Sequence, residues 1–319
     1  MGKRSRNFTG VAQFLKTITS AFEAPTPELT QNLHEAPPKE AHRPSPKKRK
    51  LNEKWDEIDV LQLVPKYTVE GDVPEDLKKY FAQRHRYFSL YDDGCLLDEE
   101  GWYSVTPEKI AEQIAERCRC DTILDAFCGV GGNAIAFART CHRVIAIDNS
   151  PTRLAIARHN ATIYGVQNRI EFILSDYLDF ARSYASLPSS QRTIDAVFLS
   201  PPWGGPSYIT GTPTETNEGE TQPSFNTFSL RSILPIPGDE LFHLSRQVSH
   251  NVAYFLPRNV DLNEVSGLLK KSPSTLPELI STQREELEYV EVEEEYMGNK
   301  LKAVTCYFGG LASGQEHNF

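Results

Sequence analysis

Between residues 122 and 200 the chain alternates short apolar segments with segments of helical periodicity. The apolar segments predict strands at 122–127, 143–148, 170–176 and 194–200, and the segments at 133–140 and 151–165 predict helices. Such alternation is typical of a parallel sheet with right-handed crossovers and helices on both faces. We therefore expect an α/β fold whose ligand crevice lies at the carboxyl ends of the strands.

Composition separates this region from its flanks. The 319 residues carry a net charge of −9, but the first fifty are rich in proline and hold 10 Lys or Arg against 4 Glu. We interpret 1–54 as a disordered basic tail, 55–101 as a helical N-terminal extension, 102–312 as the main domain and 313–319 as a second tail. The rest of the chain is too acidic to bind nucleic acid over a broad basic face, so any nucleic acid should be bound at a small local site.

The basic run PKKRK at Pro46–Lys50 is typical of a nuclear import signal, although a solvated basic run is the simpler alternative. It predicts an import receptor as a partner and the nucleus, including the nucleolus, as the main location, with some protein in the cytoplasm. No apolar run approaches a membrane span, and the cysteines and histidines lack the spacing of a disulfide framework or metal site. We therefore expect no membrane, no metal and a reducing compartment.

Two helix starts precede the first predicted strand. Residues 74–76, Pro-Glu-Asp, begin a small helical segment that a turn at 92–94 closes. Thr106, Pro107 and Glu108 are expected to cap a longer amphipathic helix. Most aromatic residues of the extension should pack against the main domain.

Acids and glycines follow the first two predicted strands. Asp125 ends the first strand and Asp148 ends the second, where an acid can accept the ribose hydroxyls of an adenosine. Gly129 and Gly131 lie between them, in a turn that lets the backbone approach a ligand. Because Asp125 precedes the glycines, the site suits a cationic ligand better than a pyrophosphate. With Asp176 after the third strand, the pattern predicts the sulfonium cofactor S-adenosylmethionine.

The segment FLSPPWGG, residues 198–205, follows the fourth strand. Two prolines cannot donate backbone hydrogen bonds, so the chain must leave the sheet there. Ser200 and the Pro201 carbonyl can accept hydrogen bonds from an exocyclic amine while Trp203 stacks on the base that carries it. Holding that nitrogen in line with the methyl donor supplies on the order of 7 kcal/mol or more. A buried core tryptophan is the alternative for Trp203.

Several motifs together resemble the trimethylguanosine synthase family of RNA cap guanosine-N2 methyltransferases. They are FAQRHRYFSLYDDG, GWYSVTPEKIAEQIA, DAFCGVGGNAIAFA, AIDNSP, FLSPPWGGP, NVAYFLPRN and NKLKAVTCYFG, which cover about residues 74–310. The resemblance implies a class-I, Rossmann-like methyltransferase fold and two successive methyl transfers to N2 of the 7-methylguanosine cap of small nuclear and nucleolar RNAs. A tryptophan attracts the cationic 7-methylguanine more strongly than the neutral ring, by roughly 0.5 to 2 kcal/mol.

The resemblance also implies further site residues. Phe88 would close over the site, and Lys79 and Arg258 would meet the cap phosphates, although Lys79 is equally compatible with a solvated helix charge. Besides the acids and glycines above, the donor pocket would be lined by Ser104, Thr106, Phe127, Cys128 and Asn149.

The sequence departs from the family pattern at the acceptor side. A polar insert occupies 209–226, and Ser229 stands where an acid is expected. Two alternatives remain: another amino-methyltransferase of guanine or adenine within RNA or DNA, and a catalytically silent cap-binding module. Ser200 before the prolines, where such amino-methyltransferases carry Asn or Asp, and the lack of a broad basic face argue against the first. The retained acids and glycines argue against the second.

Overall fold

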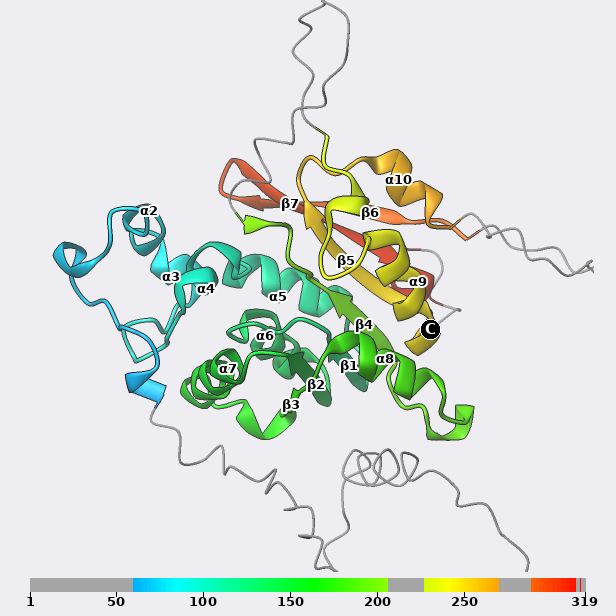
Figure 1. Cartoon of the computed structure of the whole chain (residues 1–319), viewed down its shortest axis with the longest axis horizontal. Coiled ribbons are helices and arrows are strands. Elements are labelled where there is room, and N and C mark those ends of the chain that lie inside the picture. Colours follow the sequence, from blue (N-terminus) through cyan, green and yellow to red (C-terminus); the bar gives the residue numbers. More distant parts are fainter. Residues whose placement is uncertain (1–59, 206–226, 270–287, 314–315, 317–319) are drawn as a thin grey trace, which may run out of the picture. The chain divides into compact units, whose positions relative to one another are not determined.

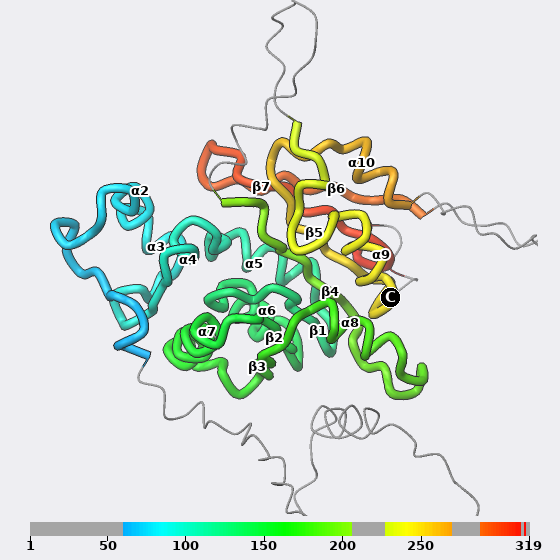
Figure 2. The backbone as a smooth tube through the Cα atoms, viewed as in Figure 1, coloured from blue at the N-terminus to red at the C-terminus, as the bar shows by residue number. Residues whose placement is uncertain are grey.

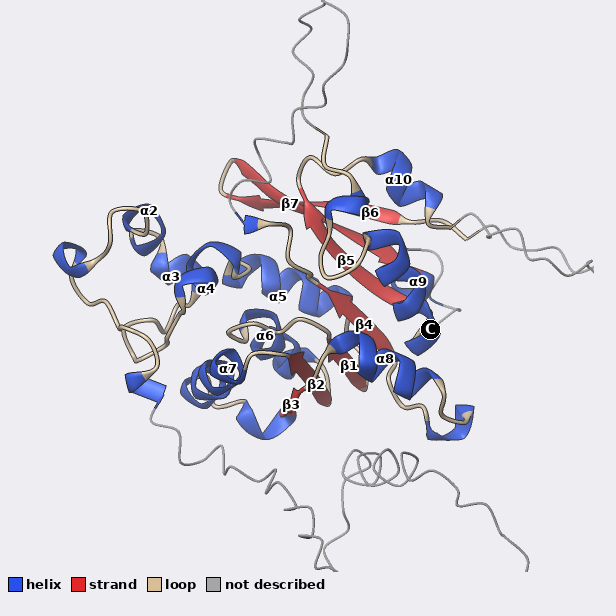
Figure 3. Ribbon diagram, viewed as in Figure 1, coloured by secondary structure: helices blue, strands red, loops and turns tan. Residues whose placement is uncertain are grey.

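The central element is a seven-stranded sheet with the order β3-β2-β1-β4-β5-β7-β6, seen in a computed structural model that describes residues 60–205, 227–269, 288–313 and 316. β7 runs antiparallel between β5 and β6, and the other neighbouring strands pair in parallel (Figure 1, Figure 3). The strands are β1 (Thr122–Asp125), β2 (Arg143–Asp148), β3 (Ile170–Leu174), β4 (Ala196–Leu199), β5 (Asn251–Pro257), β6 (Glu291–Met297) and β7 (Lys300–Phe308). The parallel pairing expected from the alternation is confirmed for β1 to β4 and extends to β5, whereas β7 and β6 add an antiparallel hairpin at one edge.

Helices cover the sheet on two sides, with α5, α6 and α7 on one side of the strands and α8, α9 and α10 on the other (Figure 1). Their bounds are α2 (Lys78–Phe81), α3 (Arg84–Tyr87), α4 (Glu99–Ser104), α5 (Glu108–Arg117), α6 (Gly132–Thr140), α7 (Pro151–Ile163), α8 (Tyr177–Ala185), α9 (Gly238–Val248) and α10 (Leu262–Gly267). Short 3-10 turns lie at Val60–Gln62, Glu70–Asp72, Gln167–Arg169, Ser189–Gln191, Leu230–Ser232 and Gly309–Leu311.

Local sequence explains where the central helices begin and end. Ser150 caps α7 by accepting a hydrogen bond from Arg153 N, and Gly165 lies just beyond its end at φ +70°, which favours glycine. The expected cap of α5 differs. Pro107 occupies the N-cap position, and no side chain caps the helix. The Thr106 hydroxyl instead accepts a hydrogen bond from Asn133 Nδ2 of α6 (2.9 Å).

The N-terminal extension packs around Trp102 of α4, which is 1% exposed. Phe81 and Tyr91 lie against it, at centroid distances of 6.2 Å and 5.6 Å. The predicted helical segment forms as two single-turn helices, α2 and α3, before the tube passes through α4 into α5 (Figure 2). These aromatic contacts bury the extension against the rest of the compact unit Trp55–Phe319.

Ser229 stands where the family pattern predicts an acid, and an acid from another element contacts it. The Ser229 hydroxyl donates to both carboxylate oxygens of Glu264 on α10, at 2.9 Å and 3.1 Å. Glu264 also accepts a hydrogen bond from Leu230 N (2.6 Å). The segment after residue 227 is therefore held by a carboxylate that lies 35 residues further along the chain.

The hairpin of β6 and β7 buries a carboxylic acid. Glu295 is 0% exposed, and Thr305 Oγ1 donates to its Oε1 at 2.5 Å, whereas Oε2 has no hydrogen-bond partner among the described residues. Burial, more than the nearby charge of Glu293, raises the pKa of Glu295 to about 7. The folded protein therefore holds a proton on this side chain up to that pH.

Glu295→Gln is expected to raise the melting temperature at pH 8 by a few degrees and to change it little at pH 4.5. The sign follows because a folded-state pKa above the ordinary 4.5 makes stability fall as the pH rises toward about 7. Thermal unfolding at the two pH values tests this. Glu294→Gln, an exposed neighbour on the other face of β6, is the control and should show no such pH dependence.

Some expectations lie outside the described residues. They concern the basic tail with Pro46–Lys50 and the insert at 209–226. Among the described helices, none is both long and apolar enough to cross a lipid bilayer. The same part of the chain does not gather three or more His, Cys, Asp or Glu side chains into an arrangement suited to a metal ion.

Candidate active site

Three neighbouring strands end at one edge of the sheet and bring predicted site residues together. β1 lies between β2 and β4, so the acids that end β1 and β2 are neighbours and the segment after β4 lies beside them. The fold thereby gathers Asp125, Asp148 and Ser200 from distant parts of the sequence. This edge is the crevice expected of an open parallel sheet.

The turn between β1 and α6 is shaped by two glycines with left-handed backbone, at φ +51° for Gly129 and +93° for Gly131. A Cβ on Gly131 would lie 3.1 Å from Ala157 of α7, whereas one on Gly129 would meet nothing within 4 Å. Gly129 N donates to Asp148 Oδ2 (3.0 Å), and Ser150 N donates to Asp148 Oδ1 (2.8 Å). The turn therefore fixes the Asp148 carboxylate and leaves space in front of Gly129.

Asp125 is a buried acid without a hydrogen-bond partner. Its side chain is 0% exposed, and neither carboxylate oxygen accepts a hydrogen bond from a residue that the structure describes. The amides of Phe127 and Ala134 are near enough to lower its pKa but do not meet hydrogen-bond geometry. Burial, reinforced by the charge of Asp148, raises the pKa to about 8. A buried carboxylate is costly unless a cation neutralises it, so Asp125 fits a ligand with an ammonium or sulfonium group.

Other predicted donor residues lie next to this turn. Cys128 is buried, and its amide donates to Ile147 O of β2 (2.9 Å). Phe127 is half-buried, with its ring 5.3 Å from that of Tyr177. Thr106 is joined to the start of α6 by the hydrogen bond from Asn133. These contacts join the glycine turn to β2, to α8 and to the segment before α5.

The last three predicted donor residues are exposed. Ser104 ends α4, and Asn149 directly follows Asp148. Asp176 caps α8, where its Oδ1 accepts a hydrogen bond from Leu178 N (2.7 Å). Helix capping alone accounts for an aspartate at this position. The second oxygen of Asp176 has no such role in the cap.

Leu174 is a candidate donor residue that the sequence reasoning missed. It ends β3, pairs with Asp148 across the sheet and is 47% exposed. An exposed apolar side chain beside the predicted ribose ligand offers a surface for the adenine ring. In the sequence Leu174 belongs to the apolar run IEFIL, so it was indistinguishable from a core residue. Its exposure at a strand end is the distinguishing observation.

The segment after β4 forms the acceptor side. Ser200 Oγ donates to Phe127 O (3.4 Å), which joins the ends of β4 and β1. Pro201 is buried, and Trp203 is half-buried with its ring 5.3 Å from that of Phe255 at 32°. Trp203 therefore rests on β5 and is neither fully buried nor fully exposed. This position allows a second flat ring to lie against it.

The extension approaches the acceptor side where Tyr80 packs on Tyr103, which lies in the last turn of α4 at the start of the main domain. A Cβ on Gly205 would lie 3.9 Å from the Tyr103 ring, which in turn lies 6.3 Å from the ring of Tyr80 on α2. Lys79 is exposed, with its ammonium 4.9 Å from the Tyr80 ring centroid. This chain of contacts places Lys79 on the part of the extension that approaches the SPPWGG segment.

Phe88 does not reach the site in this conformation. It is 2% exposed, and its ring packs against Tyr164 at a centroid distance of 6.0 Å. Core packing accounts for the residue here, and its predicted role over the substrate stays a prediction.

Arg258 lies in a positively charged cluster at the end of β5. Its Nη1 donates to Leu301 O (3.4 Å) in the hairpin strand that also carries Lys300 and Lys302. The pKa of Lys302 is lowered, first by burial and then by the positive charges of Lys300, Arg258 and Arg86. Sequence reasoning missed Lys302, because β7 comes beside β5 only through the strand order. An acidic chain that gathers these cations in one place offers a local site for phosphate groups.

Comparison with known proteins gives a consistent result. A family model described as RNA cap guanine-N2 methyltransferase matches residues 120–311. Trimethylguanosine synthase of Schizosaccharomyces pombe is 41% identical over 225 residues, which cover 67% of this chain and 84% of that protein. Trimethylguanosine synthase of Saccharomyces cerevisiae is 35% identical over 218 residues, covering 64% and 63%. Among solved structures, a methyltransferase of Geobacter sulfurreducens matches with a TM-score of 0.37 at 16% identity, covering 75% of this chain and 93% of that one.

Proposed function

The chain belongs to the RNA cap guanine-N2 methyltransferase family, and from this premise we propose that it converts 7-methylguanosine caps to 2,2,7-trimethylguanosine with S-adenosylmethionine as methyl donor. The observation that carries the proposal is the meeting of a partnerless buried acid, Asp125, with the Ser-Pro-Pro-Trp segment at one sheet edge. The first accounts for a cationic donor, and the second for a flat base that bears an amine.

The donor residues fit S-adenosylmethionine, which would supply an electrophilic methyl group on a positively charged sulfur. Asp125 would neutralise the cationic methionine end of the cofactor. Asp148, held by two backbone amides, has lone pairs left for the ribose hydroxyls. Gly129 leaves space for close approach, and Leu174 offers an apolar surface for the adenine.

Ser200 would orient the guanine amine as a hydrogen-bond acceptor. Its hydroxyl proton already points to Phe127 O, so the lone pairs of Oγ remain for an N2–H group. The Pro201 carbonyl can accept the second N2–H, and Trp203 would stack on the ring. This arrangement holds the nitrogen toward the donor without a general acid, because the donor leaves as a neutral thioether.

Three further parts of the proposal rest on the sequence and the family. The capped substrates would be small nuclear and nucleolar RNAs, in line with the family resemblance. The protein would act in the nucleus, and the run Pro46–Lys50 would bind an import receptor. Microscopy of the full chain with and without the basic run tests the location.

Incubation with S-adenosylmethionine and either 7-methyl-GTP or GTP, followed by mass spectrometry, tests the central proposal. Addition of one and then two methyl groups to 7-methyl-GTP alone is the expected result. Equal methylation of GTP would remove the selective role of Trp203. No transfer to 7-methyl-GTP or to a capped RNA would contradict the proposed function.

Lys302→Ala is expected to raise KM for 7-methyl-GTP roughly tenfold, because it removes a partly buried cation from the proposed phosphate site. The increase should shrink in high salt. Steady-state kinetics at two salt concentrations measures both effects. Arg182→Ala is the control, since that exposed arginine pairs with Asp179 on α8. An unchanged KM in Lys302→Ala would place the phosphates elsewhere.

A further inference from the structure

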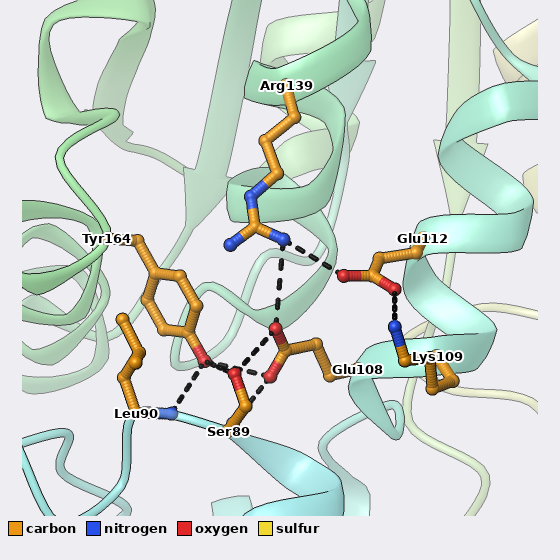
Figure 4. Close-up of polar contacts among 7 residues, drawn as sticks. All are labelled: Ser89, Leu90, Glu108, Lys109, Glu112, Arg139 and Tyr164. Carbon is orange, nitrogen blue, oxygen red and sulfur yellow. Dashed lines mark hydrogen bonds and ion pairs between the residues drawn. The ribbon is translucent and has the colours of Figure 1, made fainter.

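A single carboxylate joins the N-terminal extension to three helices of the main domain (Figure 4). Glu108, at the start of α5, accepts hydrogen bonds from Ser89 N (2.5 Å), Ser89 Oγ (3.0 Å) and Tyr164 Oη (2.9 Å). Arg139 of α6 lies 3.7 Å from its Oε1. We name Ser89, Leu90, Glu108, Arg139 and Tyr164 the Glu108 cluster.

Tyr164 holds the same segment of the extension from the other side. Its hydroxyl accepts a hydrogen bond from Leu90 N (3.4 Å) and lies 3.5 Å from Ser89 Oγ. Its ring packs on Phe88 and lies 5.0 Å from the Arg139 guanidinium. Three consecutive extension residues are thus fixed by two side chains. Stabilisation of the α5 start would explain a glutamate there, but not its double hydrogen bond to Ser89.

The segment fixed in this way leads directly to the acceptor side. α2 and α3 lie immediately before Phe88, and α2 carries Tyr80, which packs against Tyr103 beside Gly205. On the other side, Glu108 follows the Thr106 that meets the start of α6. The Glu108 cluster therefore connects the part of the extension nearest the SPPWGG segment to the donor site.

We propose that Glu108 and Tyr164 are positioning residues for methyl transfer, which hold residues 78–90 of the extension against the acceptor side so that the capped nucleotide is bound in a productive orientation. The inference rests on the proposed function. Neither side chain needs to touch the substrate. Loss of either side chain is expected to weaken the binding of the capped nucleotide and to leave the donor site intact.

Tyr164→Phe tests the proposal in the full chain, because it removes the hydroxyl and keeps the ring that packs on Phe88. Tyr184→Phe is a matched control, because the Tyr184 hydroxyl also accepts backbone hydrogen bonds: it accepts from Thr193 N (2.5 Å) and Ile194 N (2.8 Å), at a site remote from the extension in sequence, whereas the Tyr164 hydroxyl accepts from Leu90 N. Both changes remove hydrogen bonds of a tyrosine to backbone, so a general loss of stability should affect both variants alike.

Two measurements decide the result. Hydrogen exchange of residues 78–90 should become faster in Tyr164→Phe, and KM for 7-methyl-GTP should rise roughly five- to tenfold, with the Kd of S-adenosylmethionine within about twofold. Tyr184→Phe should show neither change. Ser89→Ala should raise KM in the same direction, and adding it to Tyr164→Phe should give less than the product of the two effects.

Other outcomes overturn the proposal. Faster exchange with an unchanged KM would make the cluster purely structural, and unchanged exchange would show that it does not hold the segment. An equal KM increase in both tyrosine variants would indicate general destabilisation. If the wild-type protein transfers no methyl to 7-methyl-GTP, the proposed function fails instead. The exchange measurement, with 7-methyl-GTP affinity in place of KM, then still decides the role of the cluster.

Discussion

Trp203→Ala is expected to reduce kcat/KM for 7-methyl-GTP by roughly two to three orders of magnitude, since it removes both base stacking and the alignment that depends on it. The Trp203 ring is half-buried on Phe255, so the structure holds one face of it in place. A cationic 7-methylguanine is a better partner for this ring than guanine. Single-turnover kinetics and calorimetric titration with S-adenosylmethionine separate the acceptor defect from donor binding, which should be unchanged.

Trp203→Phe provides the matched comparison, because it retains a smaller aromatic face on the same backbone. It should recover a large part of the activity and lose some selectivity for 7-methyl-GTP over GTP. Full activity of Trp203→Ala on capped nucleotides would show that the ring only packs against β5.

Asp125→Asn is expected to weaken S-adenosylmethionine binding by at least about a hundredfold. The positive charge of the bound cofactor would then be buried without the carboxylate that neutralises it. The same change should stabilise the free protein at neutral and higher pH, since it removes a partnerless buried acid. Calorimetric titration measures the first effect, and thermal unfolding without cofactor measures the second. If Asp125→Asn binds S-adenosylmethionine less tightly but has a higher melting temperature, Asp125 serves cofactor binding at the expense of stability.

The pH dependence gives this prediction a definite sign. The folded-state pKa of Asp125, about 8, lies above the ordinary 3.8, so the folded protein holds the proton and loses stability as the pH rises between these values. The stability advantage of Asp125→Asn should therefore grow from pH 5 to pH 8. Cofactor affinity of the wild type should rise over pH 6 to 8, because a cationic ligand favours the ionised acid.

Asp148→Asn supplies the contrast. The Asp148 carboxylate already accepts hydrogen bonds from Gly129 N and Ser150 N, so an amide, which has one acceptor oxygen, must give up one of them. This variant should bind the cofactor less tightly and also have a lower melting temperature than the wild type. If both variants changed stability in the same direction, the difference that we draw between the two acids would be wrong.

Sequence patterns predicted the strand ends well, because apolar runs bounded by polar turns leave few choices. β2 coincides with its expected range, β1 and β3 each end two residues earlier than expected, and β4 is three residues shorter in total. The α5 cap was harder to predict. Thr106 has the side chain of a capping residue, but Asn133 lies within hydrogen-bond reach only in the folded chain.

Residues brought together by distant pairing could not be found from the sequence. Lys302 lies near Arg258 because β7 pairs with β5, and the local pattern of NKLKAV does not predict that pairing. Glu264 supplies an acid to Ser229 in the same way. Phe88 shows the opposite case, since the family resemblance suggested a substrate contact and the structure packs the ring on Tyr164.

The place of β7 in the sheet has a consequence for synthesis on the ribosome. β1 to β5 can pair while the chain is still growing, so the glycine turn and both acids can form early. β5 nevertheless remains an open edge until residues 300–308 emerge and pair with it. Chains that terminate before Lys300 should therefore aggregate through β5 and lack Lys302. Premature termination before Lys300 should therefore abolish activity, even though every donor-binding residue named above has already been translated.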